Sequence, residues 1–172
     1  MHPEFPIEQM LRSKDETVQG QLSQEIWRQR LVRGGDTLYV PVSYGLRVFA
    51  RNEDALQSAV AALCVRFGGA LIVELPSVRY ACGAQVLEPY MEVKLSGPDS
   101  HLALVRNGVG RRRGRTTAVY RHNGHFVLSA EAPMASLLGY ADELDELTMG
   151  SVALRMELKR YVRIDDDGPE AA

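Results

Sequence analysis

The chain has 172 residues, 45% of them hydrophobic and 24% charged, and its formal net charge is −2. This length suits one domain or two small ones, and a charge this close to zero does not by itself predict a polyanionic partner. No apolar run is long enough to span a bilayer, and the first residues lack the order of a signal peptide. With two cysteines at no metal-ligand spacing, the composition predicts a soluble, cytoplasmic protein without membrane association.

The first half predicts the order strand, helix, two strands, helix, strand. Alternating β-branched and aromatic residues indicate the strands, and apolar residues at helical spacing indicate the helices. Asp15 is a suitable N-cap for the first helix, and Asn52 or Asp54 for the second. The elements lie at residues 5–13 (strand), 16–33 (helix), 36–45 and 46–52 (strands), 55–67 (helix) and 70–80 (strand).

The second half repeats this order, with a hairpin turn at Asn123-Gly124. Both halves therefore predict an α+β fold of two tandem ferredoxin-like (βαββαβ) domains, each with two helices on one face of a four-stranded antiparallel sheet. We expect domains at residues 1–82 and 83–166 and a disordered tail at 167–172. The second set of elements lies at residues 88–97 (strand), 98–112 (helix), 115–133 (two strands), 134–148 (helix) and 151–164 (strand).

Three phrases in the second half carry a family resemblance. They are "LEPYMEVKLSGP" at residues 87–98, "RRRGR" at 111–115 and "LGYADELDELTMG" at 138–150. In this order and spacing they resemble the C-terminal domain of elongation factor G-type translational GTPases. The first half resembles the earlier ferredoxin-like (third) domain of the same factors, through "DALQSAVAALCVRFGGALIVELPSVRY" at residues 54–80.

The departures from this family limit what the resemblance implies. The chain has no G-x-x-x-x-G-K-[ST] string for binding nucleotide phosphates. Only residues 81–86 separate the two halves, where elongation factor G places its decoding arm. Asp145 replaces a basic residue that is frequent late in the second helix, and Val152 replaces an expected glycine. We therefore expect no GTP binding and no GTPase activity on this chain.

The resemblance implies a non-enzymatic, ribosome-associated protein, or the C-terminal segment of an elongation factor G relative, that docks on ribosomal RNA and protein. The alternative is a protein-interaction module, dimeric or regulatory, that acts away from the ribosome; ferredoxin-like sheets are compatible with a homodimer. The sequence contains no G-x-S-x-G or H-E-x-x-H motif and no evident nucleophile-base pair. We expect no catalytic residues, no cofactor and no metal.

Clustered arginines are the candidates for RNA binding, because basic side chains give affinity for phosphates without reading sequence. The same residues are also typical of a solvated helix end whose cations favour the helix dipole. They are Arg106, Arg111, Arg112, Arg113 and Arg115.

The candidates for other contacts are Trp27 with Arg28 and Arg30, which could stack on a base or pack against the sheet edge, and Tyr140 in the second domain. His122 and His125 flank the hairpin turn. They lack further metal ligands nearby, so an exposed pair is favoured over a metal site.

Overall fold

The computed structural model describes residues 4–14, 16–28, 33–82 and 85–164. It divides into two compact units, Met1–Arg79 and Tyr80–Ala172. The sequence placed the division at residues 82 and 83. In the structure, the short strand β7 (Ala81–Cys82) pairs with β8 (Val86–Pro98) of the second unit.

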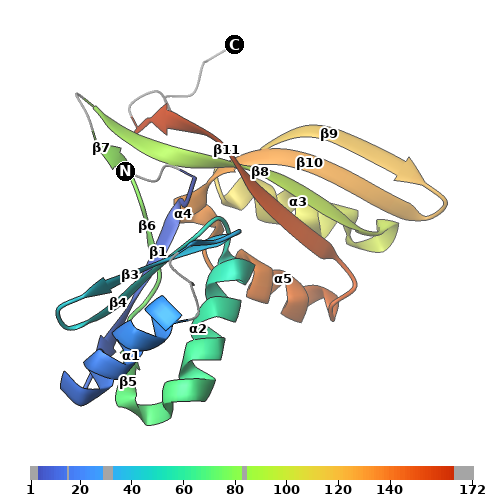
Figure 1. Ribbon diagram of the computed structural model, residues 1–172. Coiled ribbons are helices and arrows are strands. Elements are labelled where there is room, and N and C mark those ends of the chain that lie inside the picture. The colour runs from blue at the N-terminus through green and yellow to red at the C-terminus, as the bar shows by residue number, and fades with distance from the viewer. Residues whose placement is uncertain (1–3, 15, 29–32, 83–84, 165–172) are drawn as a thin grey trace. The chain divides into compact units, whose positions relative to one another are not determined.

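The first unit is an antiparallel sheet with two helices, α1 (Glu16–Arg28) and α2 (Glu53–Phe67), which both contact β1, β3 and β4 (Figure 1). The strands run in the order β2-β3-β4-β1-β5, and β6 also pairs with β1. Four neighbouring strands, β3-β4-β1-β5, have the order of a ferredoxin-like fold. The strands are β1 (Ile7–Ser13), β2 (Arg33–Gly34), β3 (Thr37–Val42), β4 (Gly45–Ala50), β5 (Leu71–Val73) and β6 (Ser77–Val78).

Alternation along the strands separates the two faces of this sheet. Ile7 and Leu11 of β1 are fully buried, whereas the intervening Glu8 and Met10 are only partly buried. Because successive side chains of a strand point to opposite faces, the first pair belongs to the core and the second to the face without helices. The predicted cap of α2 is confirmed, since the Asn52 side chain accepts a hydrogen bond from the backbone N–H of Ala55 at 2.9 Å.

The second unit repeats the plan with the strand order β11-β8-β10-β9. The two halves thus form an α+β structure of two sheets, each packed with helices, as the sequence predicts for tandem ferredoxin-like domains. Its remaining elements are η2 (Asp99–His101), α3 (Leu102–Arg111), β9 (Arg115–His122), β10 (His125–Pro133), α4 (Met134–Leu137), α5 (Tyr140–Thr148) and β11 (Ala153–Arg163).

The hairpin predicted at Asn123-Gly124 is confirmed. It joins β9 to β10, and both turn residues have left-handed backbone angles, with φ of 50° and 76°. Positive φ at both central positions is the requirement of a type I′ turn, which matches the twist of the flanking strands.

Three predicted elements differ in the structure. The helix predicted at residues 16–33 is described over Glu16–Arg28, and Arg33 belongs to β2; the predicted cap Asp15 and residues 29–32 lie outside the described residues. The strand predicted at 70–80 is interrupted between β5 and β6, where Pro76 has no N–H for a sheet. The helix predicted at 134–148 is divided because Gly139 adopts the left-handed conformation, with φ of 74°.

Candidate functional site

The arginine cluster of the second unit surrounds the junction between α3 and β9. Arg112 is its most buried member, with 15% of its side chain exposed. Its guanidinium lies 4.1 Å from the centre of the Tyr140 ring, donates to the backbone oxygen of Gly108 at 3.3 Å and pairs with Glu143. Because these contacts occupy the group on several sides, Arg112 joins α3 to α5.

Tyr140 is buried, with 1% of its surface exposed, and it requires space on α3. A Cβ atom on Gly108 would lie 2.8 Å from the Tyr140 hydroxyl, so only glycine admits the ring at this position. Burial raises the pKa of the Tyr140 hydroxyl, and the charge of Arg112 opposes part of this increase. The sequence proposed Tyr140 as an interaction residue; in the structure its ring supports Arg112 from inside the unit.

Arg113 and Gly114 form the turn that leaves α3. Arg113 has a φ of 58°, and its guanidinium lies 3.5 Å from a carboxylate oxygen of the buried Glu88. A Cβ on Gly114 would lie 2.7 Å from the backbone oxygen of Val109 and 2.6 Å from its Cγ1. The arginine-arginine-glycine phrase in the sequence is therefore a structural unit that directs the chain from the helix into the sheet.

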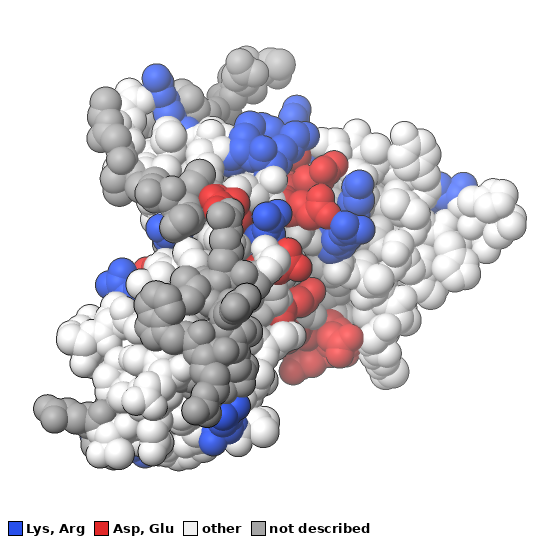
Figure 2. All heavy atoms as spheres, viewed as in Figure 1, with Lys and Arg blue, Asp and Glu red and all other residues white. Residues whose placement is uncertain are grey.

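The remaining arginines of the cluster are accessible. Arg111 is 68% exposed and its guanidinium is 3.5 Å from Glu143. Arg106 and Arg115 are exposed, and among the described residues their guanidinium groups have no hydrogen-bond or ion-pair partner. On the face drawn in Figure 2, basic side chains lie beside acidic ones rather than in a broad basic surface. The arginine cluster therefore offers an anion a few accessible side chains and not a strongly positive electrostatic field.

The other candidates contribute less to a site. The side chains of Trp27 and Arg28 and the whole of Arg30 lie outside the described residues. His122 and His125 are exposed at the hairpin. Within the described ranges there is no group of three potential metal ligands, and no helix there is long and apolar enough to cross a membrane.

Sequence reasoning missed the acidic partners of the cluster. Glu88 and Glu143 bind Arg113 and Arg112, but they lie far from them along the chain. Glu88 stands inside the leucine-glutamate-proline phrase, and Glu143 follows Tyr140 by one helical turn. Both phrases carry the family resemblance in the sequence, but neither phrase indicates a contact with the arginines. Those contacts depend on the packing of α5 and β8 near the end of α3.

The fold and this cluster define a class: an α+β protein of two ferredoxin-like units whose second unit has arginines at the helix-to-sheet turn. Residues 85–171, about half of the chain, match the family described as "Elongation factor G C-terminus", and the chain belongs to this family.

Relatives with curated names agree with this assignment. The chain is 34% identical over 82 residues to "Elongation factor G 1" of Bdellovibrio bacteriovorus, covering 47% of this chain and 12% of that protein. It is 29% identical over 130 residues to "Ribosome-releasing factor 2, mitochondrial" of Danio rerio, covering 74% of this chain and 16% of that protein. The chain thus spans less than a fifth of either relative.

A solved structure has a similar fold. It is a crystal structure of a protein from Thermus thermophilus, with a TM-score of 0.63 over 93% of this chain and 41% of that one. The sequence identity is 15%, so this likeness bears on the fold alone.

Proposed function

We propose that this protein is a non-enzymatic, ribosome-associated factor that docks on ribosomal RNA through the accessible arginines of its second unit. The match of residues 85–171 to the elongation factor G C-terminus is the observation that carries this proposal. The names of the two relatives, an elongation factor and a ribosome-releasing factor, support the same setting.

We assign the arginines to two roles, support of the fold and contact with phosphates. Arg112 serves as an internal support because it is held by Tyr140 and Glu143. Arg106 and Arg115 serve as the phosphate contacts, since their guanidinium groups are exposed and have no partner among the described residues. Each guanidinium can donate two hydrogen bonds to one phosphate, which favours arginine over lysine at such positions.

Co-sedimentation with ribosomes over a series of salt concentrations tests this assignment. We expect binding that weakens with salt, and a loss of binding in the Arg106→Glu/Arg115→Glu variant. If each arginine neutralises one phosphate, the slope of log affinity against log salt falls by about two in the variant.

The control is Lys94→Glu/Arg163→Glu, which makes the same change in charge at two other exposed positions of the second unit. We expect this variant to sediment like the parent protein. Equal losses in both double variants would assign binding to overall charge and not to the cluster. Failure of the parent chain to sediment at low salt would contradict the proposed function and favour an interaction module that acts away from the ribosome.

A further inference from the structure

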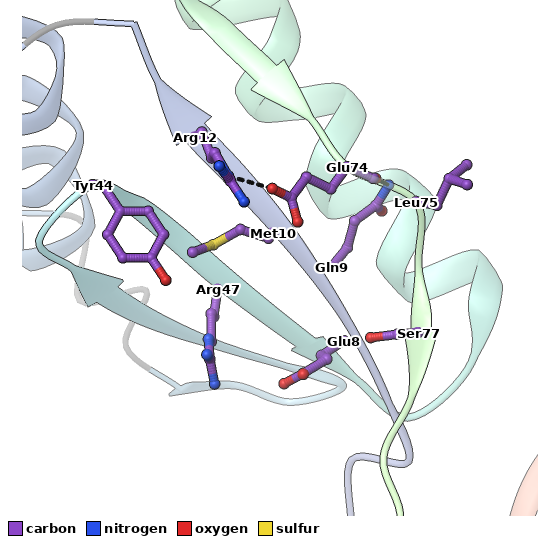
Figure 3. A pocket seen from close by; sticks show the side chains of 9 residues that line it. All are labelled: Glu8, Gln9, Met10, Arg12, Tyr44, Arg47, Glu74, Leu75 and Ser77. Carbon is purple, nitrogen blue, oxygen red and sulfur yellow. Dashed lines mark hydrogen bonds and ion pairs between the residues drawn. The ribbon is translucent and has the colours of Figure 1, made fainter.

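The face of the first sheet that carries no helix has a groove of about 150 Å³. Met10, Tyr44 and Arg47 are among the side chains that line it (Figure 3). Glu74, Leu75 and Ser77, from the stretch where β5 ends and β6 begins, form one wall of the groove. Its lining residues are Glu8, Gln9, Met10, Arg12, Tyr44, Arg47, Glu74, Leu75 and Ser77.

Hydrogen bonds hold the wall of the groove in place. The backbone N–H of Glu74 donates to the backbone oxygen of Met10 at 2.9 Å. The side-chain amide of Gln9 donates to the backbone oxygen of Glu74 at 2.7 Å. The wall is therefore anchored to β1 through two successive residues, Gln9 and Met10, and the groove is preformed rather than a gap in a loose loop.

Arg12 and Arg47 line the groove together with Glu8 and Glu74, so the formal charges of the lining balance, and Arg79 from outside the lining also pairs with Glu8. Arg12 pairs with Glu74, and its guanidinium lies 5.7 Å from the centre of the Tyr44 ring. Arg79 approaches Glu8 at 3.7 Å. Arg47 is exposed and has no hydrogen-bond or ion-pair partner among the described residues. Each carboxylate thus has its own arginine, and Arg47 remains for an anion from outside.

The residues paired with Arg47 in the two neighbouring strands are apolar. Met10 is its partner in the register of β1 and β4, and Val40 is its partner in β3. Tyr44 is 51% exposed and Leu75 is 89% exposed. Arginine, tyrosine and methionine are enriched at the centres of protein interfaces. A nucleic acid would instead meet two carboxylates and a single unpaired arginine, which is a weak field for a polyphosphate.

We propose that this groove binds an extended acidic segment of a partner protein. One carboxylate of the segment lies on the Arg47 guanidinium, and its apolar side chains lie on Met10, Tyr44 and Leu75. The proposal does not depend on ribosome binding, because it concerns the first unit and uses none of the arginines of the second.

Nuclear magnetic resonance of the full isotope-labelled chain tests it with defined probes. The first probe is an acetylated, amidated hexapeptide of alternating leucine and glutamate; the second replaces glutamate with glutamine; the third is a uridine hexanucleotide. We expect the acidic peptide to shift the Arg47 side-chain N–H and the Met10 methyl signals, with little effect from the other two probes.

Arg47→Glu should weaken binding of the acidic peptide by about tenfold or more, because it removes a charge-assisted hydrogen bond and adds repulsion. Arg47→Gln should weaken it less, and Lys94→Glu, with the same charge change in the second unit, should leave it unchanged. Circular dichroism confirms that each variant is folded.

Three outcomes would overturn the proposal. They are binding of the glutamine peptide as tightly as the acidic one, unchanged affinity in Arg47→Glu, and absence of any shift with the acidic peptide. Shifts with the uridine probe alone would assign the groove to nucleic acid and reject the protein segment. None of these results bears on sedimentation of the Arg106→Glu/Arg115→Glu variant, so the two proposals fail separately.

Discussion

Each sheet has one face that carries no helix of its own unit, and these two faces differ. The difference lies in how the last strand of the unit pairs with the first strand. In the first unit, β5 pairs with the end of β1 and β6 pairs with its beginning, and the chain between β5 and β6 is not part of either strand. In the second unit, β11 follows β8 from Ala153 to Arg163 with one irregularity. The first face has a groove of about 150 Å³, whereas the hollow among Glu92, Lys94, Arg155 and Glu157 on the second is about 10 Å³.

The same difference appears in the charges. On the second face, Glu131 is 7% exposed and binds Lys159 at 2.7 Å and Arg160 at 2.8 Å, so both cations have a carboxylate partner. On the first face, Arg47 has no partner among the described residues. The same topology thus has paired charges around Glu131 in one unit and an unpaired, accessible arginine in the other. The difference arises because the interrupted strand of the first unit changes which side chains lie next to one another.

The largest expected effect comes from adding a side chain at Gly45, where β4 begins and lies against the backbone of β1. A Cβ on Gly45 would lie 2.9 Å from the Cα of Arg12 and closer still to the backbone oxygen of Leu11. Neither backbone atom can move without breaking the pairing of β1 with β4. We expect Gly45→Ala to destabilise the first unit by about 3 kcal/mol or more, measured by urea unfolding.

Gly35→Ala is the matched control for this change, since a Cβ at Gly35 meets nothing within 4 Å. It should alter stability by less than about 0.5 kcal/mol. An equally stable Gly45→Ala would show that the strands tolerate a shift, and the groove would then not be rigid.

A second test compares an arginine that supports the fold with one that does not. Arg112→Leu removes the contact with the Tyr140 ring, the ion pair with Glu143 and a hydrogen bond to Gly108. We expect a loss of about 1–3 kcal/mol in the stability of the second unit. Arg47→Leu, at an exposed position without such contacts, should cost less than about 0.5 kcal/mol. Similar losses for both would contradict the division of roles.

The smallest expected effect concerns the pH dependence of the second face. Hydrogen bonds from Lys159 and, more weakly, Arg160 lower the pKa of the Glu131 carboxyl, and burial opposes them. The folded state therefore favours ionised Glu131. The stabilisation is present above the pKa of an unfolded glutamate, about 4.3, and is lost as the pH falls through the lower folded value.

We expect urea unfolding of Glu131→Gln to show a shallower loss of stability than the parent between about pH 5 and pH 3. The difference should be below about 1 kcal/mol, because both cationic partners are partly exposed. Glu157→Gln removes an exposed carboxylate of the same face and is the control. A parent and a Glu131→Gln variant with parallel pH profiles would contradict the role of this carboxylate.

Local patterns determined most of the elements of this protein. Alternation along β1 and β8, helical spacing in α2 and the Asn123-Gly124 turn depend on near neighbours in the chain, so the βαββαβ order of each half followed from them. The interruptions at Pro76 and Gly139 also had local signals, but a proline and a glycine do not by themselves determine whether an element breaks, because packing can hold it together.

The tertiary structure alone decided which charges are available. Arg112 and Arg106 have the same chemistry, yet the first is held by Tyr140 and the second is exposed, because α5 packs over the end of α3. Arg12 and Arg47 carried no sequence signal of a site at all. Their difference arises where the chain between β5 and β6 brings Glu74 to one of them and not to the other, and such a contact depends on residues far apart in sequence.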